Sequence, residues 1–87
     1  MKLRIWHIQN VPNRPIYIPV ESPEEAIRVI NERAEKDLKT LGIVSNAFGL
    51  EVFNKEEKEW EEWYSEEGSD IDQYAEDLKK QFTGKLE

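Results

Sequence analysis

Residues 49–68 of this 87-residue chain, GLEVFNKEEKEWEEWYSEEG, contain the signals of a β-hairpin. The first six residues of this stretch, GLEVFN, alternate side chains toward two faces, which is typical of a strand. The KEEK that follows is a polar turn. If the chain reverses there and returns as a strand, this part of the molecule is a hairpin.

The second half of the stretch, EWEEWYS at residues 59–65, is open to two interpretations. As a helix, it would cluster Trp60, Trp63 and Tyr64 at i, i+3 and i+4 spacing. As a strand, it would place Trp60 and Tyr64 on one face and Trp63 on the other. We favour the strand, because the run is short, rich in aromatic residues and ends at Gly68.

The chain before this stretch contains a second pair of predicted strands. KLRIWHIQ, residues 2–9, carries apolar and aromatic side chains on both faces, which indicates a central strand. NVPNRP then forms a tight connection to IYIPV, residues 16–20. Pro19 has no N–H to donate to a ladder, so this second strand is expected at an edge of the sheet.

The sequence also predicts two helices. Ser22-Pro-Glu-Glu25 combines an N-cap serine, a proline at the first helical position and early acids, and Gly42 is a stop signal. An apolar stripe is expected at Ala26, Ile27, Ile30, Ala34, Leu38 and Leu41.

The last segment begins with Asp70-Ile-Asp-Gln73, which has the spacing of a capping box. A second register of the cap is offered by Ser69. The expected stripe is Ile71, Tyr74, Ala75, Leu78 and Phe82, and Gly84 is expected to end the helix.

The predicted order is β-β-α-β-β-α, which is an α+β fold with a small, mostly antiparallel sheet and two helices packed on one face. The length indicates a single domain over residues 1–85. Residues 86–87 resemble the remnant of an engineered tag and are excluded from the predicted domain.

Composition excludes several classes of protein. The chain has no cysteine and one histidine, so disulfides, thiolate metal sites and histidine clusters are excluded, and we expect neither a metal nor a cofactor. It lacks a signal peptide and a long apolar run, so we expect a cytoplasmic protein of the host cell without membrane insertion.

Charge is unevenly distributed along the chain, whose net charge is −7. Residues 1–50 hold seven basic and six acidic residues, whereas residues 51–87 hold five basic and thirteen acidic residues. The acidic half would repel nucleic acid, so we expect no direct nucleic-acid binding and a protein partner with a basic surface. The alternative is that the acids only maintain solubility.

No motif indicates catalysis. His7 lies in a predicted strand without a nucleophile motif beside it, and the four glycines are too far apart for a phosphate loop. Any catalytic pair chosen from nineteen acids would be arbitrary. We therefore expect a non-enzymatic protein.

The aromatic residues are the more informative candidates for a site. Two helices cover only one face of a sheet, so some aromatic side chains should remain on the other face beside acids. The predicted partner-binding residues are Trp60, Trp63, Tyr64, Glu59, Glu61 and Glu62. The alternative is that the same rings only cover the sheet and stabilise cross-strand pairs.

The chain resembles a family of small proteins encoded by phages and prophages of Gram-positive bacteria. Three stretches carry the resemblance: IWHIQNVPNRPIYIPVESPEEA, SNAFGLEVF and EWEEWYSEEG. The resemblance covers residues 3–68. Members of this family are often labelled superinfection exclusion proteins or phage proteins of unknown function, so the resemblance implies a phage-derived interaction protein and carries no catalytic residues.

Two further hypotheses stay open at this point. The thirteen acids of residues 51–87 would suit a nucleic-acid mimic that blocks a DNA-binding protein, provided that they follow one surface. Alternatively, the chain is a small structural protein that self-associates through the strand containing Pro19 or through the open face of the sheet.

Overall fold

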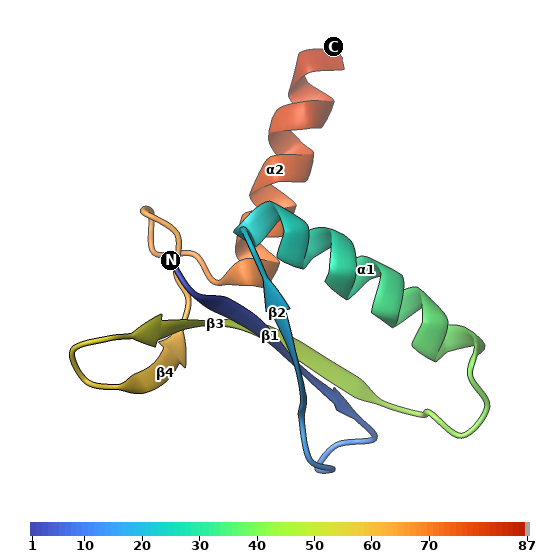
Figure 1. Ribbon diagram of the computed structural model, residues 1–87. Helices are drawn as coiled ribbons and strands as arrows, with labels where there is room; N and C mark the ends of the chain where they lie inside the picture. The colour runs from blue at the N-terminus through green and yellow to red at the C-terminus, as the bar shows by residue number, and fades with distance from the viewer. Residues whose placement is uncertain (87) are drawn as a thin grey trace.

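The computed structural model describes residues 1–86, with the side chains of residues 1–81, as one four-stranded sheet and two helices (Figure 1). The elements are β1 (Leu3–Gln9), β2 (Ile16–Val20), α1 (Pro23–Lys39), β3 (Asn46–Asn54), β4 (Glu59–Glu62) and α2 (Ile71–Leu86). This order confirms the predicted α+β fold. The assignment of residues 1–85 to one domain and of the last two residues to a tag stays a prediction, and Glu87 lies outside the described residues.

The sheet is antiparallel throughout, with the strand order β2-β1-β3-β4. The first strand is central, as predicted, because Ile5 pairs with Ile18 on one side and with Leu50 on the other. The strand with Pro19 lies at an edge, also as predicted. Phe53 pairs with Trp60 across the β3–β4 hairpin, which confirms the strand interpretation of residues 59–62.

The core lies on one face of the sheet, beneath both helices. It consists of Leu3, Ile5, Val20, Ala26, Leu50, Trp63 and Ile71. Strand β1 contributes every second residue to it, because successive side chains of a strand point to opposite faces. Within residues 1–86 both helices lie on this one side of the sheet, so the predicted arrangement of two helices on one face is confirmed (Figure 1).

Helix α1 begins at the predicted cap, where the Ser22 hydroxyl accepts from the Glu25 N–H at 3.0 Å. Its predicted apolar stripe is wrong at the C-terminal end. Leu38 and Leu41 are 87% and 101% exposed, whereas Asp37 is buried. Residues eleven apart lie almost in line on a helix, so Ala26 and Asp37 both face the sheet while Leu38 turns about 100° away.

Helix α2 also begins at the predicted cap, where the Asp70 carboxylate accepts from the Gln73 N–H at 2.9 Å. The prediction that Gly84 ends this helix is wrong, since the helix continues through it to Leu86. An isolated glycine costs only about 1 kcal/mol inside a helix and does not by itself stop one. The side chain of Phe82 lies outside the described residues.

The first turns of α2 contact β3 and α1, and the rest of the helix points away from the sheet (Figure 1). Neither helix contains, within residues 1–86, a stretch long and apolar enough to cross a membrane.

Candidate functional site

The face of the sheet opposite the helices is the candidate site, and we call it the open face. Strand alternation and the pairing register place on it Lys2, Arg4, Trp6, Ile8, Tyr17, Gly49, Glu51, Phe53, Trp60 and Glu62. The set combines four large aromatic side chains with two cations and two carboxylates. Trp and Tyr supply large, rigid contact areas, which is why such residues are enriched in binding surfaces.

Arg4 is the centre of the open face. Its Nε–H donates to Glu51 Oε1 at 2.8 Å, and both side chains are 22% exposed. Its guanidinium carbon lies 3.8 Å from the ring centroid of Tyr17 and 4.1 Å from that of Trp60. The cation is therefore held between two aromatic rings. Guanidinium groups favour this arrangement, because they are planar and stack on aromatic faces, and because their positive charge is attracted to the electron-rich face of the ring.

The arrangement continues to the outer edge of β4. The Lys2 ammonium lies 5.4 Å from the Phe53 ring centroid and 5.6 Å from that of Trp60. Phe53 and Trp60 meet edge to face at 5.3 Å. Tyr17, Arg4, Trp60, Lys2 and Phe53 thus form a continuous aromatic–cation belt from one edge of the sheet to the other, with Tyr17 48% exposed.

A shallow hollow lies beside the belt. It has a volume of about 250 Å³ and is lined by Trp6, Ile8, Pro15, Tyr17 and Glu51. The indole of Trp6 lies directly over Gly49, because a Cβ at that position would be only 2.2 Å from the ring. Gly49 is therefore required for Trp6 to lie flat on the sheet, and Trp6 in turn forms a wall of the hollow.

The structure separates the residues that the sequence predicted as one binding set. Trp60 lies half-buried on the open face and belongs to the belt. Trp63 follows the end of β4 and is only 7% exposed in the core, where it meets Tyr74 edge to face at 5.4 Å. A surface anchor at Trp63 is incompatible with this burial. Tyr64 is 59% exposed.

The three predicted glutamates are separated in the same way. Glu62 pairs with Glu51 across the strands on the open face. Glu61 pairs with Val52 and accepts from the Asn54 amide at 3.0 Å, so it lies on the opposite side of β4, and Glu59 shares that side. The binding role of this set stays a prediction, with only Trp60 and Glu62 placed on the open face.

Sequence reasoning missed Arg4 and Lys2 as members of the site. Period-2 alternation already placed Arg4 beside Trp6 on one face of the first strand. Alternation alone does not show that β1 pairs with β3, and it is this pairing that brings Trp60 of β4 within reach of Arg4.

His7 forms the other polar cluster, and it is buried beneath α1. Its Nε2 lies 2.8 Å from Asp37 Oδ2, and its Nδ1 accepts from the Arg33 Nε–H at 3.0 Å. In this arrangement Nδ1 faces a donor and Nε2 faces an acceptor. Both ring nitrogens are occupied within the fold, which makes His7 a structural residue in this geometry.

Asp37 is the acceptor that this buried cluster surrounds. Gln9 donates to its Oδ1 at 2.9 Å, and Asn46 donates to its Oδ2 at 3.0 Å. Burial acts to raise the pKa of Asp37, but the hydrogen bonds from Gln9, Asn46 and His7 outweigh it and lower the pKa below its ordinary value. The carboxylate is therefore ionised and fully engaged in stabilising the fold.

The acids of the second half lie on several surfaces. Glu62 is on the open face, Glu61 on the opposite side of β4, and Glu76 and Asp77 line separate hollows on two sides of α2. Burial, followed by the charges of Asp70, Glu51 and Asp72, raises the pKa of Glu62 above its ordinary value. The acids of the second half therefore do not follow one surface, although Asp70, Glu51 and Asp72 lie close enough to Glu62 to act on its charge.

Comparison with known proteins gives two matches. The sequence profile of the family described as superinfection exclusion gene product 17 matches residues 2–82. A superinfection exclusion protein of Salmonella phage P22 is 33% identical over 101 residues, covering 95% of this chain and 98% of that protein. No solved structure matches the chain. The expected phage relationship is confirmed, whereas the Gram-positive part of the expectation is unsupported, since this relative comes from a phage of Salmonella.

Proposed function

This chain belongs to the superinfection exclusion gene product 17 family, and we propose that it acts in superinfection exclusion, without catalysis, by binding a host or phage protein through the open face. The observation that carries this proposal is the aromatic–cation belt on the sheet face opposite both helices. A surface used only for solubility has no need of a continuous belt that contains three large aromatic side chains.

The belt is suited to binding because its geometry exists before a partner arrives. Arg4 is fixed by Glu51 and by the two stacked rings, so little side-chain entropy remains to be lost on association. Tyr17 is half-exposed at the edge of the sheet and presents its ring to a partner. Rigid aromatic anchors of this kind contribute most of the binding energy in protein interfaces.

The charge at the β4 end of the face supports a partner with a basic surface. Burial, and after it repulsion by Asp70, Glu51 and Asp72, raises the pKa of Glu62. A cationic side chain of a partner would relieve this repulsion and so gain affinity and orientation at that end. We place this binding in the cytoplasm of the host cell.

No observation favours the two alternatives. A nucleic-acid mimic needs its acids along one surface, and here they lie on both sides of β4 and of α2. Self-association through the β2 edge has only the position of that strand in its support, and Pro19 removes one donor from that edge.

The proposal is tested by measuring plaque formation of a superinfecting phage on cells that express the chain. Tyr17→Ser and Trp60→Ser each remove one ring that stacks on Arg4, and both should restore plating of the excluded phage. Leu41→Ser is the matched control, because it removes a fully exposed apolar side chain outside the sheet. Circular dichroism and thermal melting of each purified variant establish that it remains folded.

Exclusion that survives both open-face changes in folded variants would overturn the assignment of the surface. Loss of exclusion in the Leu41 variant alone would also overturn it and would direct attention to the end of α1. The expected pattern is loss with either belt variant and retention with the control.

A further inference from the structure

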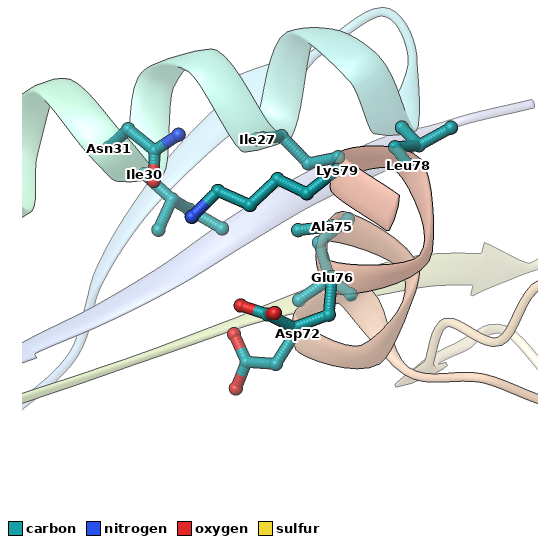
Figure 2. A pocket seen from close by; sticks show the side chains of 9 residues that line it. Ile27, Ile30, Asn31, Asp72, Ala75, Glu76, Leu78 and Lys79 are labelled. Atoms are coloured by element: carbon teal, nitrogen blue, oxygen red, sulfur yellow. The ribbon is translucent and has the colours of Figure 1, made fainter. Parts of the chain in front are cut away.

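A second surface, a cleft between the two helices, is not used by the open-face proposal. It has a volume of about 610 Å³, and its floor is formed by apolar side chains that include Ile27, Ile30 and Ile71. Figure 2 shows Lys79 reaching across the cleft toward α1, with Asp72 and Glu76 on the same side of α2. The cleft is therefore an apolar surface with a charged rim of both signs.

The helix that forms one wall of this cleft is poorly supported. The start of α2 lies against α1 and β3, and the end of the helix projects away from the sheet (Figure 1). A helix of 16 residues is marginal in water without packing against another element. A projecting α2 helix could therefore be stabilised by packing into an apolar cleft, and the cleft could be covered by such a helix.

Charge is segregated along α2 in a way that matches the cleft. Its first half carries Asp72, Glu76 and Asp77, and Lys79 and Lys80 follow directly. The helix dipole favours acids and bases only within the first and last turn, whereas Glu76 and Lys79 lie near the middle of the helix. Among the side chains that the structure describes, neither of these two residues makes an ion pair.

We propose that two copies of the chain form a two-fold dimer in which each α2 lies antiparallel to the other, within the partner's cleft. A two-fold axis that passes between residues 77 and 78 places Glu76 of each copy opposite Lys79 of the other. Each such contact occurs twice, because a two-fold interface is isologous. The apolar floor packs against the projecting helix, and the charged rim sets its antiparallel direction.

The second copy is the occupant because the charges are self-complementary. One helix carries both the acid and the base that the antiparallel partner requires, at positions related by the axis. The dimer leaves the open face on the opposite side of the sheet, so it is compatible with the binding surface described above (Figure 1).

The test uses sedimentation velocity on the full chain over a concentration series. The wild type should show a monomer–dimer equilibrium. Glu76→Lys and Lys79→Glu should each weaken the dimer by about tenfold or more, since each converts two attractive contacts into two repulsive ones. Glu32→Lys is the control, because Glu32 is an exposed α1 residue outside the cleft that pairs with Arg28, and it should leave the dimer unchanged.

Mixing the two cleft variants gives the decisive measurement. A heterodimer of Glu76→Lys with Lys79→Glu again has opposite charges at both contacts, so the mixture should associate more strongly than either variant alone. A misfolded variant could not produce this rescue. A wild type that stays monomeric at all concentrations, or a dimer insensitive to both reversals, would overturn the proposal.

Discussion

The two faces of the sheet each hold an arginine, a carboxylate and an aromatic ring in contact, yet the two clusters differ in what surrounds them. On the helix-covered face, Arg33 donates to His7, which stacks on Phe48 at 4.1 Å and reaches Asp37. On the open face, Arg4 donates to Glu51 between two rings. His7 and Arg4 are only three residues apart on β1.

The difference is that the buried cluster is closed and the open cluster is not. Asp37 accepts from three side chains, so its capacity for hydrogen bonds is used within the fold. The belt instead leaves Tyr17 half-exposed and the charge near Glu62 unrelieved. One cluster therefore uses its polar groups within the fold, and the other leaves an aromatic ring exposed at the surface.

The largest expected effect separates the two tryptophans of the β4 hairpin. Trp63→Ala should lower the free energy of unfolding by about 3–5 kcal/mol, because it empties a core position beneath α2. Trp60→Ala should cost only about 1 kcal/mol, since its ring is half-exposed on the open face. Urea denaturation of both variants measures the contrast, and equal costs would show that the belt is part of the core.

The second effect compares the two carboxylates directly. Asp37→Ala should cost about 3 kcal/mol, because it leaves the donors of Gln9, Asn46 and His7 buried without an acceptor. Glu51→Ala removes a partly exposed partner of Arg4 and should cost about 1 kcal/mol or less. Denaturation at one pH compares them, and a Glu51 cost as large as that of Asp37 would contradict the distinction between closed and open clusters.

The third effect concerns the close approach of Trp6 to β3. Gly49→Ala should cost about 1–3 kcal/mol, because the new Cβ displaces the indole that lies 2.2 Å from its position. In a Trp6→Leu background the same change should cost much less, since a smaller side chain can move aside. The coupling between the two sites in a double-mutant cycle measures this contact, and additive costs would contradict it.

The fold was predictable because its signals are local. Ser22 and Asp70 cap their helices with their own neighbouring amides, and Pro19 marks an edge strand wherever the partners lie. Leu38 was wrongly predicted to face the sheet, because the side of α1 that faces the sheet includes Asp37. The burial of Asp37 requires hydrogen-bond donors from β1 and β3. An acid is expected at the surface unless those donors are known.

The candidate site was less predictable because it is assembled from four strands. Alternation alone separates Trp60 from Trp63, but it does not say which of them faces the helices. That choice follows from the register of β4 against β3, where Trp60 meets Phe53 and Trp63 continues past the strand into the core. The stacking of Arg4 between rings from β2 and β4 requires the whole strand order.

The smallest expected effect is on pH dependence, where Asp37 and Glu62 should behave in opposite ways. Hydrogen bonding lowers the pKa of Asp37 below its ordinary value of 3.8, despite burial, so its stabilisation is present above that pH and is lost as the pH falls further. Burial and neighbouring acids raise the pKa of Glu62 above 4.5, so its contribution to stability is favourable below that pH and is lost as the pH rises.

Glu62→Gln should therefore stabilise the protein slightly at pH 7 and have no effect near pH 4. Asp37→Asn should destabilise the protein at pH 7 and progressively less in acid. Thermal melting of both variants from acid to neutral pH measures the two trends. Parallel trends would show that the acids near Glu62 are already neutralised within the protein, which would remove the electrostatic reason for a basic partner at that end of the open face.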